Sequence, residues 1–268
     1  MQKFIPEIII NHLKKNGIDY IKSLPDQKYA TYSDVVQYCV EKCAEKGEPA
    51  VDFAKLVMDA VSLGYDERYH DTTEIQDERI AIKDEFCTSF GQILEELSIY
   101  SRISNLKVVV VGIGDGLEGE MLYNRIDDLT IVDIAPNSLN NAKSQLPYAT
   151  SHMTGAENLE FASDSQFDVY ISLRTYQSTF FDIFGSLKEA KRVLKHDGAI
   201  VVSVASGYLD ANNGFIHGLY NPFTKVFEKD RPDIFLNYIE YCLIALGFAI
   251  IGIKRILTEI FIYAHKNE

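Results

Sequence analysis

The sequence predicts an α/β protein in which a helical region precedes a mostly parallel sheet. Three observations carry this prediction. Up to Asn105 the apolar residues recur at helical spacing almost throughout. After it, short β-branched runs alternate with helical segments, the pattern of parallel strands joined by crossover helices. The chain ends in two strands so close in sequence that they must be antiparallel neighbours. We therefore expect a helical cap over residues 1–104 and a sheet domain over residues 105–268.

The apolar spacing predicts four helices before Asn105. Ser33 can cap the second of them, and Pro49 suits the first turn of the third. Gly17, Gly47 and Gly64 follow the first three apolar patterns, and we expect a helix to end near each. The fourth helix is expected from about Glu74 to Tyr100.

The strands are expected where β-branched and aromatic residues form short, unbroken runs. Such runs are typical of strands buried on both faces. The predicted strands are Lys107–Val111, Leu129–Val132, Asp168–Ser172, Ala199–Val204, Phe248–Ile256 and Glu259–His265. The helices Phe181–Leu194 and Ile234–Leu246 separate the later ones, and the turn His196–Gly198 follows the first of these. Residues 206–232 are expected to form an insertion in which Gly214–Tyr220 pairs with Lys225–Phe227 as a hairpin.

Composition narrows the function classes. The net charge of −13 argues against a general nucleic-acid binder, which needs a basic surface. No apolar run approaches the roughly 20 residues of a membrane span, and the first residues carry no apolar signal segment. The four cysteines are too few for a disulfide scaffold, and no set of ligands around Cys39 and Cys43 completes a metal site. We therefore predict a cytoplasmic protein with reduced thiols and no bound metal.

A glycine turn follows the first strand directly, at Gly112-Ile113-Gly114-Asp115-Gly116. Glycine is needed where the backbone must turn tightly and approach a ligand closely. Asp133 ends the next strand, at the offset where a carboxylate can bind ribose hydroxyls. Residues 114–119 also match G-x-G-x-x-G, so the turn alone fits a nicotinamide dinucleotide as well as S-adenosylmethionine (SAM). A helix N-cap is the structural alternative for Asp133.

Three further segments resemble the class I SAM-dependent methyltransferases. The antiparallel pair at the end of the chain is similar to the reversed seventh strand of that family. The segment Thr154–Phe161, followed by Phe167–Ser172, resembles the adenine loop and fourth strand. Glu189–Gly198 resembles the helix and turn before the fifth strand. The resemblance covers residues 105–268 and implies a seven-stranded, Rossmann-like sheet, mostly parallel, with an antiparallel last strand.

The resemblance also implies the cofactor, SAM, and the residues that would bind it. The backbone of the glycine turn would face the methionine part, and Asp133 would accept hydrogen bonds from the ribose. Ile134 would pack on the adenine, and the loop would contact the adenine edge. Leu173 would lie near the sulfonium. The implied cofactor residues are Gly112, Ile113, Gly114, Asp133, Ile134, Ala156, Glu157 and Leu173.

Two positions depart from the family pattern. Val110 stands where the family usually carries an acid two residues before the first glycine, and Gly155 stands where the adenine loop often has an aspartate. The first departure leaves the ammonium of SAM without its usual partner, for which Asp115, Tyr69 and His70 are candidates.

Catalytic candidates follow the fourth and fifth strands, because ligands bind at the carboxyl ends of such strands. His217 is the candidate base, since its ordinary pKa lies near neutrality; the alternative is an exposed hairpin residue. Arg174 is a candidate clamp for a substrate carboxylate or phosphate, with a salt bridge between the sheet and the cap as the alternative. Tyr176 can contact the substrate or serve ordinary packing. The basic residues of the helix before the fifth strand are expected to face solvent.

The predicted function is transfer of a methyl group from SAM to an O, N or C atom of a small molecule. Peptide or RNA methylation, a nicotinamide-dependent oxidoreductase and a non-catalytic SAM-binding protein are the alternatives. The acidic chain makes nucleic acid an unfavoured partner, and no membrane association is expected. The exposed face of the helical cap is a candidate surface for a homodimer.

Overall fold

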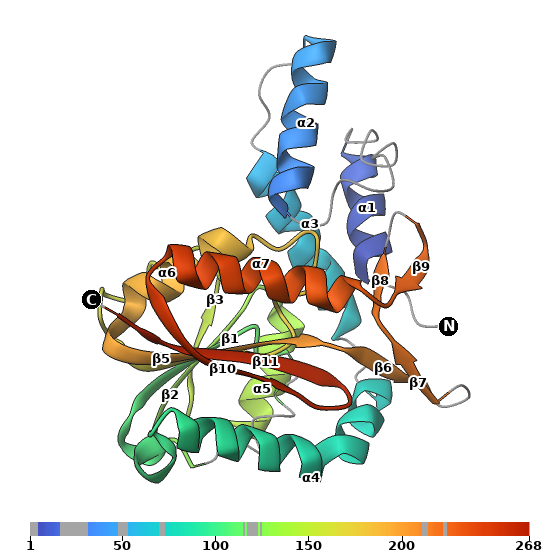
Figure 1. Cartoon of the computed structure of the whole chain (residues 1–268). Coiled ribbons are helices and arrows are strands. Elements are labelled where there is room, and N and C mark those ends of the chain that lie inside the picture. The colour runs from blue at the N-terminus through green and yellow to red at the C-terminus, as the bar shows by residue number, and fades with distance from the viewer. Residues whose placement is uncertain are drawn as a thin grey trace.

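A seven-stranded mixed sheet forms the centre of the molecule (Figure 1). The computed structural model describes residues 5–16, 32–47, 53–69, 73–114, 116, 123, 125–210, 214–221 and 224–267. The strand order is β10-β11-β5-β4-β1-β2-β3. The strands are β1 (Lys107–Val111), β2 (Asp128–Asp133), β3 (Thr150–Met153), β4 (Phe167–Ser172), β5 (Leu194–Ala205), β10 (Phe248–Arg255) and β11 (Glu259–Lys266).

The direction of the strands confirms the predicted fold class. β1, β2, β3, β4 and β5 pair in parallel, and β11 pairs antiparallel with both β5 and β10. The reversed strand therefore lies inside the sheet, between β5 and β10. The sequence did not predict β3, whose polar residues Thr150, Ser151 and His152 pair with β2 alone at one edge of the sheet.

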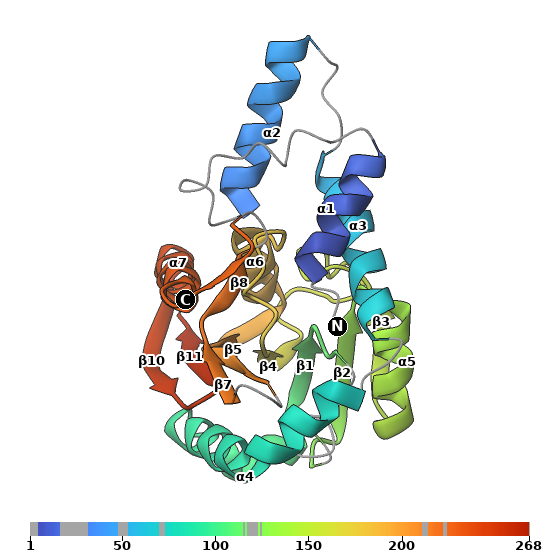
Figure 2. The same ribbon diagram turned by 90° about the vertical axis from the view of Figure 1, so that its right-hand side faces the viewer.

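Helices cover both faces of the sheet (Figures 1 and 2). On one face lie α6 (Ile183–Val193) and α7 (Arg231–Ala245), and on the other lie α4 (Thr73–Glu96) and α5 (Pro136–Gln145). Successive residues of each strand point to opposite faces, so Val109 and Val111 pack with α6 and α7 while Val108 and Val110 pack with α4 and α5. Both clusters are apolar, which explains the unbroken β-branched runs of the sequence.

Three helices stand above the carboxyl edge of the sheet (Figure 2). They are α1 (Ile5–Lys15), α2 (Tyr32–Lys46) and α3 (Phe53–Arg68). α4 instead packs on the sheet, where Phe86 and Phe90 contact Phe261 of β11 with ring centroids 5.5 and 6.5 Å apart. The helices over the sheet edge are thus α1–α3, and a domain boundary at residue 104 stays a prediction.

The third helix ends later than predicted. Gly64 lies buried within α3 rather than at its end, because a glycine inside a helix costs only about 1 kcal/mol, which packing against α1 can offset. Pro49 lies outside the described residues. The fourth helix ends at Glu96, and a short 3-10 helix over Tyr100–Asn105 leads into β1.

The predicted insertion contains two short hairpins instead of one. β6 (Gly207–Asp210) pairs with β7 (Gly214–His217), and β8 (Leu219–Asn221) pairs with β9 (Val226–Glu228). The predicted hairpin is therefore confirmed for Tyr220, which pairs with Phe227, and is wrong for residues 214–217, which pair with β6. The turn predicted at 196–198 lies within β5 as an irregularity: the pairing with β4 skips from Leu194 to Ala199, and Asp197 adopts a positive φ of 57°.

No helix in the described part of the chain is long and apolar enough to cross a membrane.

Candidate cofactor and active site

The glycine turn connects β1 to the end of β2. The amides of Gly112 and Ile113 donate to the carbonyl of Val132, at 2.8 and 3.2 Å. Gly112, Gly114 and Gly116 have φ values of 72°, 61° and 77°, the left-handed region in which a side chain is strained. The sequence prediction of a tight turn is confirmed in its backbone; Asp115 lies outside the described residues.

Asp133 lies beside this turn and is only 7% exposed. Its carboxylate accepts from the amide of Gly114 through Oδ2 at 3.0 Å and from the amide of Ala135 through Oδ1 at 2.9 Å. Burial raises the pKa of Asp133, and these backbone hydrogen bonds oppose that rise. Each carboxylate oxygen can accept a second hydrogen bond. The side chain can therefore hold the turn in place and still accept hydroxyl donors.

The loop after β3 is attached to the same place. The amide of Thr154 donates to the carbonyl of Asp133 at 3.1 Å. Farther along the loop, the carboxylate of Glu157 folds back onto Gly155 and occupies the point where a Cβ of residue 155 would lie. Burial raises the pKa of Glu157. A carboxyl group thus stands next to position 155 although Gly155 itself carries no side chain.

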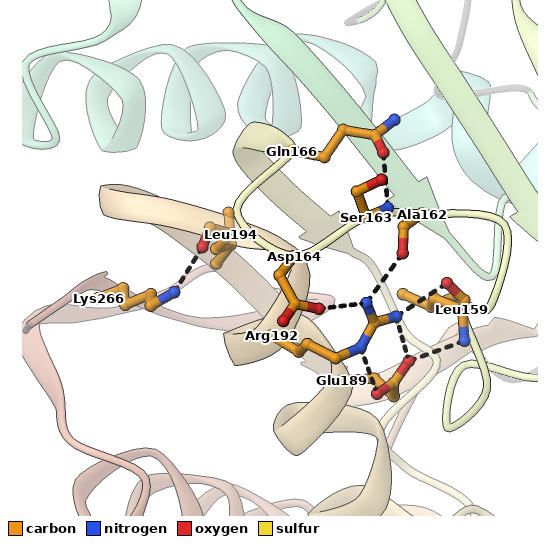
Figure 3. Close-up of polar contacts among 9 residues, drawn as sticks. All are labelled: Leu159, Ala162, Ser163, Asp164, Gln166, Glu189, Arg192, Leu194 and Lys266. Carbon is orange, nitrogen blue, oxygen red and sulfur yellow. Dashed lines mark hydrogen bonds and ion pairs between the residues drawn. The ribbon is translucent and has the colours of Figure 1, made fainter.

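Two side chains of α6, Arg192 and Glu189, form hydrogen bonds with the remainder of this loop (Figure 3). Arg192 donates to the carbonyls of Leu159 and Ala162, at 2.9 and 2.8 Å, and to the carboxylates of Glu189 and Asp164. Glu189 in turn accepts from the amide of Leu159 at 3.0 Å. The expectation of a solvated basic face is therefore wrong for Arg192. Its guanidinium reaches across because the loop presents carbonyls that need donors.

The segment after β4 lies against the glycine turn. Leu173 is 8% exposed. The hydroxyl of Thr175 fills the space that a Cβ at Gly112 would occupy, and it donates to the carbonyl of Leu173 at 3.3 Å. The sequence did not single out Thr175, since a threonine after a strand has no special signal without its neighbours.

Arg174 has an internal carboxylate partner. Its Nε lies 3.2 Å from Oε2 of Glu259, a residue of β11 that is fully buried. Its Nη2 donates to the carbonyl of Thr258 at 3.2 Å, and its backbone amide donates to Oγ of Ser203 at 3.0 Å. The salt bridge thus joins the end of β4 to β11 within the sheet rather than to the helices above it.

Tyr176 is fully buried. Its hydroxyl lies 3.0 Å from that of Tyr170, and its ring packs edge-on against Phe181 with centroids 4.8 Å apart. Burial raises the pKa of Tyr176 well above its ordinary value. These contacts favour the packing role that the sequence left open.

His217 is exposed and lies on β7 opposite Gly207, just past the end of β5. Its ring stands edge-on to Phe215, with centroids 4.6 Å apart. Nearby, Gln177 accepts from the amide of Ala205 at 2.6 Å and donates to the hydroxyl of Tyr208 at 3.2 Å. Gln177 therefore joins the segment after β4 to β5 and β6, close to the carboxyl edge.

One candidate from the helical region also reaches the turn. The hydroxyl oxygen of Tyr69 lies 2.9 Å from the point where a Cβ at Gly114 would be. His70, the other candidate, is outside the described residues. Among the described residues no group of three His, Cys, Asp or Glu side chains could hold a metal ion.

Residues 109–202 match the model of a family described as "Methyltransferase domain". The match runs from β1 to β5 and includes the glycine turn, Asp133 and the loop after β3. No curated protein matches the chain.

Solved structures share the fold at low sequence identity. The cyclase SpnF superposes with a TM-score of 0.50 at 12% identity, covering 68% of this chain and 81% of that chain. An S-adenosylmethionine dependent methyltransferase from Mesorhizobium loti superposes with a TM-score of 0.47 at 13% identity, covering 61% of this chain and 92% of that chain. The N-methyltransferase NodS from Bradyrhizobium japonicum superposes with a TM-score of 0.47 at 13% identity, covering 70% of this chain and 98% of that chain.

The family match and the strand order together decide between the two cofactors that the glycine turn allowed. The reversed strand β11 beside β5 and the matched domain both agree with the family that binds SAM. Residues 109–202 thus match a methyltransferase domain, and the chain has the sheet of the class I SAM-dependent methyltransferase fold.

Proposed function

We propose that the protein transfers the methyl group of SAM to a small-molecule acceptor held between the sheet edge and the segments above it. The observation that carries this proposal is a closed contact over the carboxyl edge. The hydroxyl of Tyr220, in β8, donates to the carboxylate of Glu7, in α1, at 2.9 Å. The insertion and the helical region thus meet each other above the edge where the strands end.

The cofactor would lie along the edge from the loop after β3 to the glycine turn. Asp133 would accept hydrogen bonds from the ribose, and Ile134 and Ala156 would border the adenine. Glu157 would accept from the adenine amino group, because its carboxylate stands beside Gly155, where the family often has an aspartate. Leu173 would lie near the sulfonium, opposite the backbone of residues 112–114.

Tyr69 would bind the amino-acid end of the cofactor. Val110 is 2% exposed and offers no acceptor, so the ammonium or carboxylate needs another partner. The hydroxyl of Tyr69 lies beside Gly114 and can donate or accept.

The acceptor would bind between the segment after β4 and the first hairpin of the insertion. SAM supplies a methyl group that is already activated on a sulfonium, so the protein mainly aligns the acceptor and excludes water. Gln177 and Tyr208 place an amide and a hydroxyl at this edge. His217 is the proposed base for an acceptor that must lose a proton. It pairs with Gly207, which follows the end of β5 at Ala205 by two residues.

A labelling experiment tests the proposal. Three separate incubations each contain the protein and SAM with a labelled methyl group. Each also contains one fraction of a cell extract: small molecules, peptides or RNA. We expect label in the small-molecule fraction, and we expect Asp133→Ala to abolish it. Label confined to peptide or RNA would refute the small-molecule acceptor and leave methyl transfer intact.

His217→Ala and His217→Gln then test the base. An unchanged rate in both variants at neutral pH would remove His217 from the proposed mechanism.

A further inference from the structure

One face of α3 follows the proposed cofactor site from end to end. Met58, Ser62 and Asp66 are four residues apart, and Tyr69 directly follows the end of the helix. Residues at this spacing share one side of a helix. The distance along the helix from the first to the last is about 16 Å. Each of the four contacts a different part of the sheet edge.

Met58 and Ser62 contact the adenine side. The terminal methyl of Met58 reaches within 2.5 Å of the point where a Cβ at Gly155 would lie. Oγ of Ser62 donates to the carbonyl of Ile134 at 2.8 Å, on the residue proposed to border the adenine. The helix thus rests on the two segments between which the adenine would bind.

Asp66 contacts the start of α5, directly after Asp133 and Ile134. The N-cap of α5 is Ala135, whose side chain cannot accept a hydrogen bond. Asp66 fills this role from α3, since its Oδ1 accepts from the amide of Asn137 at 2.7 Å. The Nδ2 of Asn137 also donates to the carbonyl of Asp66 at 3.1 Å. A carboxylate at a helix N-terminus is favoured by the helix dipole as well.

Tyr69 contacts the methionine side. Its hydroxyl lies by Gly114, as described above, and its backbone carbonyl accepts from Nδ2 of Asn141 in α5 at 2.9 Å. The hydrogen bonds described for this face of α3 join it to Ile134, directly after β2, and to α5.

We propose that α3 is a cover over the cofactor, and that the contact between Asp66 and Asn137 is the latch that must open for SAM to enter and S-adenosylhomocysteine (SAH) to leave. The inference rests on the proposed cofactor site. Side chains of α3 touch both ends of that site, so outward movement of the helix would open the space between them for ligand exchange. Asp66 and Asn137 also border an open groove of about 570 Å³ between α1 and α3, so the latch is reached from solvent.

Rates of SAH exchange test the latch, measured on the full chain by surface plasmon resonance. Asp66→Ala removes one charge-assisted hydrogen bond, which corresponds to about a tenfold change in rate. We expect both association and dissociation to become about tenfold faster, with the equilibrium affinity nearly unchanged. A variant that merely damaged the fold would lose affinity instead. Asp59→Ala, on the exposed side of the same helix, is the matched control and should keep wild-type rates.

A reversible cross-link gives the second arm. In the double variant Asp66→Cys with Asn137→Cys, the reduced protein should exchange SAH quickly, as Asp66→Ala does. Oxidation should slow the exchange of SAH at least tenfold. SAH bound before oxidation should stay bound, and SAH added afterwards should be excluded. Asn137→Cys alone should not respond to oxidation.

The outcomes separate the two proposals. Binding of SAH at one common rate in wild type, Asp66→Ala and the oxidised double variant refutes the cover and leaves the methyltransferase function intact. Failure of the wild type to bind SAM or SAH at all refutes both.

Discussion

Replacing Arg174, which forms an ion pair with Glu259, tests whether this arginine stabilises the fold or binds the substrate. Replacing Arg174 by methionine keeps much of the volume and removes the charge. Glu259 is fully buried, so its carboxylate would lose its cationic partner without gaining water, while the hydrogen bond from Oγ of Ser203 remains. At the observed separation of 3.2 Å, an effective dielectric constant of about 20 gives an attraction of about 5 kcal/mol. The wild type pays a desolvation cost to bury the guanidinium, which the variant avoids; this offsets part of the attraction, and we expect a loss of about 3–4 kcal/mol in unfolding free energy.

Urea denaturation at neutral pH measures this loss. Adding Glu259→Gln to Arg174→Met removes the buried negative charge, and we expect the double variant to recover at least half of the loss. Lys195→Met is the control, because its pair with Asp168 is partly exposed and should be worth less than about 1 kcal/mol. If Arg174→Met costs less than about 1 kcal/mol and yet abolishes methyl transfer, the structural reading is refuted and Arg174 binds the substrate.

Three further predictions concern the cofactor site and its support. Asp133→Ala should weaken SAH binding about 100-fold by calorimetry, through loss of two charge-assisted hydrogen bonds; the exposed Asp128→Ala, in the same strand, should bind normally, and equal affinities would contradict the ribose role. Gly116→Ala should lower the unfolding free energy by about 2–4 kcal/mol, because a Cβ there meets Cα of Ala142 at 2.6 Å in a backbone of φ 77°. Gly214→Ala, with φ 71° and open space around it, should cost only about 1 kcal/mol, and a similar cost for both would show that the close approach is unimportant. The hydrogen bond from Arg192 lowers the pKa of Glu189, so the stability lost in Glu189→Gln should be evident above about pH 4.3 and vanish as the pH falls through the folded pKa. A loss that persists unchanged at pH 3 in urea denaturation would exclude the ionised pair as its source.

Local pattern was enough to predict most of the sheet. The runs at 107–111, 129–132 and 168–172 became strands within a residue of their predicted ends, since each is buried on both faces and contains few polar residues. β3 was missed because its residues are polar and only one neighbour pairs with it. Gly64 misled the helix prediction because packing against α1, which local sequence does not encode, outweighs its poor helix propensity.

The residues near the glycine turn that are proposed to bind the cofactor could also be predicted from the sequence. Strand, turn and Asp133 lie within one continuous stretch, and their spacing alone brings them together. The insertion was harder, because β7 has a choice of partners and pairs with the strand before it rather than the one after. Register between short strands depends on the surrounding contacts as well as on their own residues.

The sequence by itself determined the class of fold, the position of the glycine turn and the carboxylate that ends β2. These features depend on periodicity and on residues close together in the chain. The tertiary structure alone decided that Glu259 is the partner of Arg174, that Arg192 holds the loop after β3, and that Asp66 caps α5. Each of these contacts joins residues that are at least 28 positions apart, and the more distant ones exceed 70. The partner of a buried or capping carboxylate is the donor that the fold brings next to it. Because that donor is distant in the sequence, local residue spacing does not predict it.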